Sequence, residues 1–144
     1  MRTTAALFAA LFAAAALPGA ARAEGKAPVL LVHPGPESAR PFVFQLIHYQ
    51  GAAGEVLCTS EGYKKAKAAE KAAHAAIGPG SELKHYIFQK TADAKGERHY
   101  WELRAGKKHK ALLCRSGPVD DLAQAEHSAG LATKAFAQAT VNVK

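Results

Sequence analysis

Cysteine, tryptophan and methionine are scarce in this chain, which has two, one and one of them among 144 residues. The two cysteines, Cys58 and Cys114, are far apart and form no C-x-x-C pair, so the usual ligands of a structural zinc site are missing. We therefore predict no metal site and no cofactor. In an oxidising compartment two cysteines most simply form one disulfide, and the alternative is two buried free thiols.

Catalytic motifs are also missing. The seven histidines include no H-x-x-x-H or H-E-x-x-H pair, and His48, His85 and His99 each precede a tyrosine, which is typical of strand positions. Ser60 and Ser116 lie in no G-x-S-x-G elbow, and a hydrogen bond at the entry to a helix explains both. We assign no catalytic residue and expect a protein that is not an enzyme.

A long apolar run occurs only near the N-terminus, from Ala5 to Leu17, after the basic residue Arg2. Small residues at Ala21 and Ala23 suit a signal peptidase, so we predict a signal peptide over residues 1–23 and a periplasmic or secreted protein. The alternative is a membrane anchor, but a span needs about 20 apolar residues, and we expect none. The predicted mature chain, residues 24–144, is long enough for one domain.

Acidic residues are few: the chain has 12 of them and 19 lysines and arginines, which gives a net charge of +7. Removal of residues 1–23 takes away two arginines and leaves a net charge of +5. This diffuse charge favours solubility, and we expect no nucleic acid as a partner.

The chain contains an internal repeat. A shift of 57 residues places Val29–Val32 on Tyr86–Gln89, and a shift of 56 places Val56–Ser60 on Leu112–Ser116. Each half reads as three strands and then an alanine-rich helix. Period-2 alternation in the second strand of each half predicts one row of residues on a single sheet face: Phe42, Phe44 and Leu46, and His99, Trp101 and Leu103. We predict an α+β fold of two tandem β-β-β-α repeats, about 27–78 and 83–139, in one pseudo-twofold domain with antiparallel sheets each covered by a helix.

Both helices have recognisable ends. We expect the first from about Lys64 to Ile77, stopped by Gly78-Pro79-Gly80, and the second to begin near Asp120 or Asp121, which are good N-caps. The expected buried positions are Ala66, Ala69, Ala73 and Ile77 in the first helix and Leu122, Ala125, Ala129, Ala132 and Phe136 in the second.

The segment Ser60-Glu61-Gly62-Tyr63, followed by Ala69-Glu70, resembles the repeat of the YegP-like family, in which a hairpin, a third strand ending in Ser-Glu-x-Tyr and a helix follow one another. The second half matches this pattern at Phe88, Gly96, Trp101, Leu103, Ala105, Ser116 and Ala125-Glu126. The Asn of the usual Asn-Gly turn is missing in both halves, and Gly117-Pro118 replaces the Glu-x-Tyr part of the second. The resemblance implies a β-β-β-α repeat fold, as a tandem or a dimer of single repeats, and no established activity.

Two basic groups are candidate anion-binding sites. Lys64, Lys67 and Lys71 form a stripe on the first helix, and a compact turn contains Lys107, Lys108, His109 and Lys110, joined by Arg104. Either could hold an anionic polymer such as lipopolysaccharide or a teichoic-type polymer; the alternative is a solvated helix face and a polar turn. By alternation, Tyr100 and Glu102 are expected to face outward, where an aromatic ring could serve binding.

These observations predict an exported, non-catalytic binding or interaction module with an anionic polymer or an envelope protein as its partner, as a monomer or a dimer. The alternatives are a small hydrolase or an inhibitor of one, for which the loop Pro34–Arg40 would be the inhibitory segment. A structural or stress-related protein without a small ligand is the third interpretation.

Overall fold

The computed structural model describes residues 26–144, so the predicted signal peptide lies outside the described residues and stays a prediction. Within residues 26–144 no helix is both long and apolar enough to cross a membrane. The elements are, in chain order, β3 (Val29–Pro34), β4 (Phe42–Gln50), β5 (Ala53–Thr59), α3 (Ala66–Gly80), η1 (Leu83–His85), β6 (Tyr86–Asp93), β7 (Gly96–Ala105), η2 (Lys107–His109), β8 (Ala111–Arg115), α4 (Leu122–Gln138) and β9 (Thr140–Val143).

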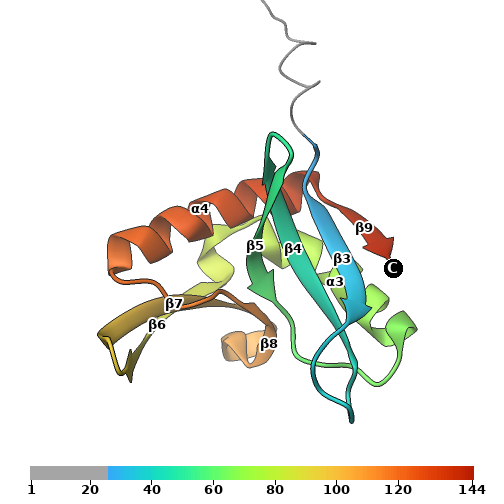
Figure 1. The fold of residues 1–144 in the computed structure, drawn as a ribbon, viewed down its shortest axis with the longest axis horizontal. Coiled ribbons are helices and arrows are strands. Elements are labelled where there is room, and N and C mark those ends of the chain that lie inside the picture. The colour runs from blue at the N-terminus through green and yellow to red at the C-terminus, as the bar shows by residue number, and fades with distance from the viewer. Residues whose placement is uncertain (1–25) are drawn as a thin grey trace, which may run out of the picture.

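The strands form one mixed sheet in the order β6-β7-β8-β5-β4-β3-β9 (Figure 1). β3, β4 and β5 pair antiparallel, as do β6, β7 and β8, and β9 adds to β3 in parallel. Within the sheet of residues 26–144, the strands of the two halves pair only where Thr59 of β5 lies beside Arg115 of β8. The expectation of separate sheets is therefore wrong, because the third strand of each half pairs with the other where both strands end.

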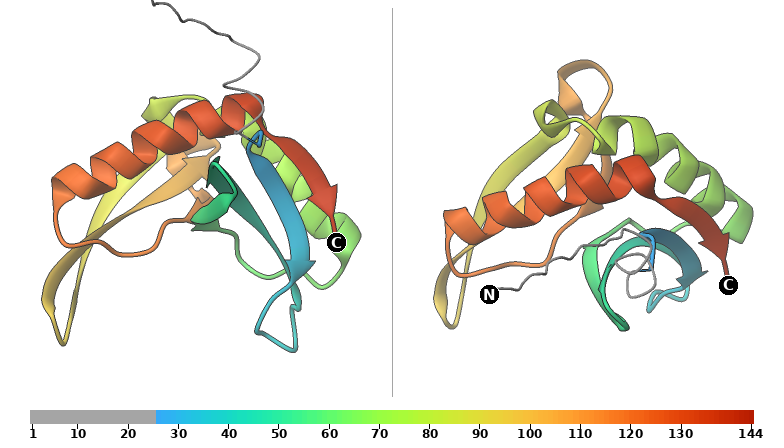
Figure 2. Two further views of the ribbon diagram at one scale, coloured as in Figure 1. Left: turned by 45° about the horizontal axis from the view of Figure 1, so that its top comes forward. Right: turned by 90° about the horizontal axis from the view of Figure 1, so that it is seen from above.

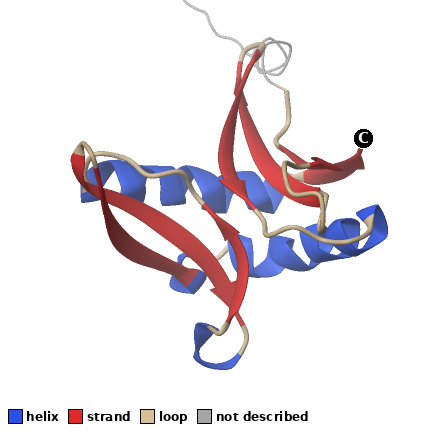
Figure 3. Ribbon diagram, turned by 60° about the horizontal axis from the view of Figure 1, so that its bottom comes forward, coloured by secondary structure: helices blue, strands red, loops and turns tan. Residues whose placement is uncertain are grey.

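Both helices lie on one side of the bent sheet (Figures 2 and 3). α3 packs against β3, β4 and β9 but also against β7, and α4 packs against β4 and β7. The expectation that each sheet has its own helix is also wrong, since each helix contacts both halves. The alanines on the buried faces allow this close packing of the helices on the sheet and on each other.

The core lies between the helices and the strands. Phe44 and Leu46 of β4 and Trp101 and Leu103 of β7 are fully buried, as the period-2 alternation predicts. His99, which was expected in the same row, is only partly buried. Residues of both halves thus share one continuous core.

α3 differs from its prediction at both ends. It begins at Ala66 and continues through Pro79 to Gly80, where Ser81 closes it with backbone and hydroxyl bonds to the carbonyl of Ile77. Gly80 is buried against the ring of Phe136, which leaves no room for a Cβ atom. This glycine therefore permits helix–helix contact, and it is not the stop signal that the Gly78-Pro79-Gly80 pattern predicted.

α4 begins as predicted. Asp121 is its N-cap, with a carboxylate oxygen that accepts a bond of 2.8 Å from the backbone N–H of Gln124. Leu122 was expected on the buried face but is 44% exposed, and Ala135 is buried. The α4 residues that belong to the core cluster are the later positions Ala129, Ala132, Ala135 and Phe136.

Candidate functional site

The predicted basic turn connects β7 to β8 as the short helix η2. Gly106, Lys108 and His109 all have positive φ angles, of 83°, 58° and 53°. Positive φ is uncommon for residues with a Cβ atom, so two in succession mark an unusual local backbone. Lys107, Lys108 and Lys110 are exposed, and they form no ion pair with any of residues 26–144.

Arg104 was predicted to join this turn, but its charge is used elsewhere. Its Nε donates to Glu102 Oε1 at 2.9 Å, and its Nη1 donates to the backbone carbonyl of Lys110 at 3.3 Å. Arg104 thus holds the end of the turn in place while its charge is balanced by a carboxylate. The three lysines remain as the turn's free cations within the part of the chain that the structure describes.

Glu102 was expected to face outward, and the structure corrects this, since Glu102 is only 2% exposed. It points away from the helices, as the alternation requires, but Arg104 and Arg115 cover it. Arg115 donates to Glu102 Oε2 from Nη2 at 2.8 Å and from Nε at 3.2 Å. Burial alone would raise the pKa of Glu102, but the hydrogen bonds and charges of the two arginines outweigh burial and lower it.

The ring of Tyr100 is also less exposed than the sequence predicted. The guanidinium of Arg115 lies 5.3 Å from the centre of its ring, in a cation–π arrangement, and the side chain is partly buried. Tyr100, Glu102 and Arg115 are therefore one packed cluster on the second half of the sheet.

The helix stripe is separate from the turn. Lys64 precedes α3, while Lys67 and Lys71 are exposed on it and line, with Glu70 and His74, an open hollow of about 380 Å³. α3 packs mainly on the strands of the first half, whereas η2 follows β7 in the second (Figure 1). The structure does not bring the two predicted basic groups together.

A row of polar side chains crosses the helix-free face of the sheet, and sequence analysis missed it. His33 Nε2 lies 2.7 Å from Gln45 Oε1, and Gln45 Nε2 donates to Thr59 Oγ1 at 3.0 Å. Thr59 in turn pairs across the junction with Arg115, which binds Glu102. Alternation from the buried cysteines would have placed Thr59 and Arg115 on this face, but only the strand pairing makes the row continuous.

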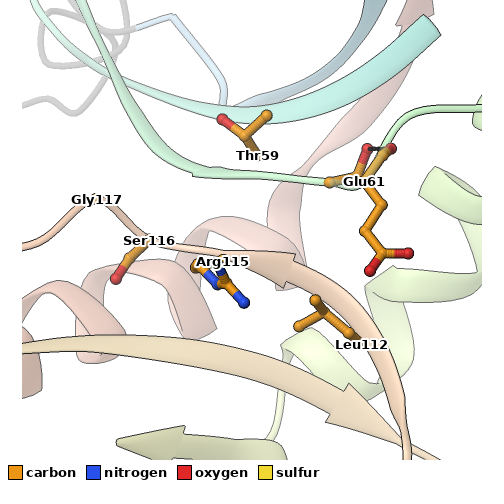
Figure 4. A pocket seen from close by; sticks show the side chains of 7 residues that line it. Thr59, Glu61, Leu112, Arg115, Ser116 and Gly117 are labelled. Atoms are coloured by element: carbon orange, nitrogen blue, oxygen red, sulfur yellow. Dashed lines mark hydrogen bonds between the residues drawn. The ribbon is translucent and has the colours of Figure 1, made fainter. Parts of the chain in front are cut away.

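A hollow of about 410 Å³ opens where β5 and β8 meet, between Thr59 and Glu61 on one side and Arg115 and Ser116 on the other (Figure 4). The serines are not free in it. Ser60 Oγ accepts from the backbone N–H of Phe44 at 2.9 Å, and Ser116 Oγ accepts from that of Trp101 at 2.9 Å. Both hydroxyls therefore have a structural hydrogen bond in equivalent places.

Cys58 and Cys114 are buried, and their Sγ atoms lie 2.6 Å apart. Both are free thiols in the structure, since a disulfide has sulfur atoms about 2.05 Å apart. Burial, and then the bond to Cys58, raises the pKa of the Cys114 thiol. The disulfide thus stays a prediction, while the closeness of the two residues is a finding.

Residues 26–144 contain no group of three or more His, Cys, Asp or Glu side chains that could hold a metal ion.

The loop from Pro34 to Arg40 bends back on itself through a bond from the Gly35 N–H to the Pro41 carbonyl. Its role as an inhibitory segment stays a prediction.

Comparison with known proteins bears on the fold. No family model matches the sequence, and no curated protein matches it. The solution NMR structure of YegP from E. coli, a protein of unknown function, is 21% identical with a TM-score of 0.62, over 82% of this chain and 93% of YegP. The solution NMR structure of a UPF0339 protein from Shewanella oneidensis is 19% identical with a TM-score of 0.62, over 82% of this chain and 92% of that protein. The chain thus has the fold of the YegP-like proteins, as its sequence led us to expect.

Proposed function

We propose that this protein is an exported, non-catalytic binding module that holds a polyanionic partner at its basic turn, Lys107, Lys108 and Lys110. The observation that carries the proposal is a difference between the halves. β4 and β5 are joined by Gly51 and Ala52 alone, whereas β7 and β8 are joined by the five residues 106–110. The shift falls from 57 to 56 across this hairpin, so the second half is one residue shorter here. Positions that are paired as strand in the first half form an unpaired loop in the second, and three of its five residues are lysines.

The geometry of the turn supports binding better than that of the helix stripe. Arg104 and buried Glu102 fix the end of the turn, so the three ammonium groups are presented from an anchored backbone. Lys67 and Lys71 instead share their surface with Glu70, whose carboxylate opposes an anionic ligand. A further contact supports the turn: the rings of His109 and His85 lie 5.8 Å apart, edge to face, and join η2 to η1.

We also infer an approximate twofold relation between the halves. Three pairs of features support it. The serine hydroxyl bonds recur at Ser60 and Ser116, isolated bridges recur at Phe42–Tyr63 and His99–Val119, and register shifts recur after Leu46 and after Leu103. With such a relation, η2 replaces the paired end of the first hairpin in a duplicated frame, and a disulfide between Cys58 and Cys114 would fix the frame near the axis outside the cytoplasm.

Heparin, a soluble polyanion, is the probe that tests the proposal. The variant Lys107→Gln/Lys108→Gln/Lys110→Gln should lose salt-sensitive retention on a heparin column, because surface charge attraction is screened over about 10 Å at 0.1 M salt. The variant Lys64→Gln/Lys67→Gln/Lys71→Gln is a matched control, since it removes the same number of charges from the other candidate site. It should elute close to the wild type. Equal loss in both variants would mean that net charge alone decides retention, and the site would be rejected.

A further inference from the structure

The edge of β5 that faces the second half is open. β5 pairs with β4 along its length, but on its other edge it pairs with β8 only at Thr59. Residues of a strand direct their N–H and C=O groups to alternate sides, so about half of the backbone groups between Ala53 and Cys58 point toward this edge. No backbone bond from any other part of residues 26–144 reaches them.

This edge forms one wall of a groove. Glu55 and Val56 of β5 line it, and Val56 is 49% exposed. The other walls are the segment 116–119, which follows β8, and one face of α4 with His127, Ser128 and Leu131. The volume is about 310 Å³, which lies in the range of ligand pockets, roughly 300–1,000 Å³.

The groove is not a generic product of the repeat. The buried positions of α3 and α4 correspond at an offset of 56, as Ala69 with Ala125 and Ala73 with Ala129. At this offset, the groove residues His127, Ser128 and Leu131 stand where α3 has Lys71, Ala72 and Ala75.

The strand side of the groove differs in the same way. Glu55 corresponds to Ala111, so the acidic group belongs to this groove alone. Three of the four compared positions, Glu55, Ser128 and Leu131, therefore have a larger side chain than the alanine at the corresponding position of the other half.

We propose that this groove binds an extended segment of a partner protein, which adds to β5 as a strand. A strand supplies the alternating N–H and C=O groups that match an open strand edge, and a helix or a compact ligand does not. This site is distinct from the basic turn and goes beyond the polyanion-binding function.

Charge complementarity defines the segment further. Glu55 is exposed and forms no ion pair with any other residue of the described range, so a Lys or Arg of the segment would face it. Val56 and Leu131 provide apolar surface for a neighbouring aliphatic side chain. The occupant is thus an extended peptide with a basic residue that faces Glu55 and an aliphatic residue that contacts Val56 and Leu131.

A phage-displayed library of random linear 12-residue peptides is the probe. Peptides selected on the folded protein should be rich in aliphatic and basic residues and should shift amide NMR signals of β5 and α4 and not those of η2. N-methylation of one backbone nitrogen in the paired stretch should weaken binding about tenfold, because it removes a strand hydrogen bond without altering the protein. Tolerance of every such N-methylation would overturn strand addition.

Matched variants test the charge. Glu55→Gln should weaken binding of a basic peptide about two- to fivefold, and Glu126→Gln, an exposed acid of α4 that does not line the groove, should have no effect. The proposal is wrong if no peptide is enriched, or if the selected peptides shift signals elsewhere. It is also wrong if sedimentation shows a dimer whose interface protects the β5 amides, since a second copy would then occupy the edge. Heparin retention is independent of all these outcomes, so failure here leaves the basic-turn proposal standing.

Discussion

The sulfur atoms of Cys58 and Cys114 lie 2.6 Å apart in the core, each one residue before the Thr59–Arg115 pair that joins the two halves of the sheet. The junction thus has a single backbone pairing and, beside it, two thiols in contact. A covalent bond at this place would strengthen the weakest connection between the strands.

We predict that protein recovered from outside the cytoplasm has this disulfide. Oxidation would remove two protons and two electrons from the thiols, as exchange with an oxidised disulfide carrier allows. The bond would close a loop of 56 residues, which the loop-entropy estimate makes worth roughly 4 kcal/mol, so reduction should lower the melting temperature.

Thiol labelling of denatured, unreduced protein tests this prediction by counting the free thiols per chain. No label should attach without a reductant, and two labels per chain should attach after reduction. Two labels before reduction would establish a pair of buried free thiols instead. A double variant Cys58→Ala/Cys114→Ala should melt at a temperature that no longer depends on reductant.

Glu102 should make stability depend on pH. Its folded-state pKa lies below the ordinary value of 4.5, so its contribution is present above that value and is lost as the pH falls through the lower folded pKa. We expect Glu102→Gln to lower the free energy of unfolding at pH 7 by roughly 1–3 kcal/mol, because two arginines lose a charged acceptor. Urea unfolding at pH 7 and pH 3 measures both effects, and the variant should differ less from the wild type at pH 3.

Glu97 provides the matched control. Its pair with Lys90, at 3.3 Å, is exposed on both sides, so Glu97→Gln should change stability by less than about 1 kcal/mol. Equal effects at Glu97 and Glu102 would contradict a special role for the buried carboxylate.

Two helical glycines should respond in opposite directions. Gly80→Ala in α3 should destabilise the protein by about 1–3 kcal/mol, because the added Cβ overlaps the ring of Phe136. Gly130→Ala in α4 places a Cβ that has no atom within 4 Å beyond its chain neighbours and its own helix backbone, so it should stabilise the helix by about 0.5–1 kcal/mol. Thermal unfolding of both variants decides the matter, and a neutral Gly80→Ala would mean that the helices pack less closely than described.

Processing should occur after Ala23. The N-terminal sequence of protein secreted by the producing cell should begin at Glu24. Replacement of Ala23 by phenylalanine should leave the longer precursor, because the peptidase accepts small residues there. A mature cytosolic protein that retains Met1 would contradict export and weaken the case for the disulfide.

Much of the fold was accessible from the sequence because its signals are local. Strand alternation placed Phe44, Leu46, Trp101 and Leu103 in the core, and an aspartate before an alanine-rich stretch indicated the start of α4 at Asp121. The order of three strands and a helix in each half was predicted in the same way. A resemblance carried by short motifs also agreed with the fold of two solved structures.

Long-range pairing was decided only by the tertiary structure. Alternation tells which face a residue occupies but not which strand lies beside it, so the Thr59–Arg115 junction and the single sheet could not be read from period 2. For the same reason Glu102 was assigned to solvent, and only the approach of Arg115 from another strand buried it. The basic residues were visible in the sequence, but which of them remain free depends on acids that the fold brings within hydrogen-bonding distance, as Glu102 does for Arg104.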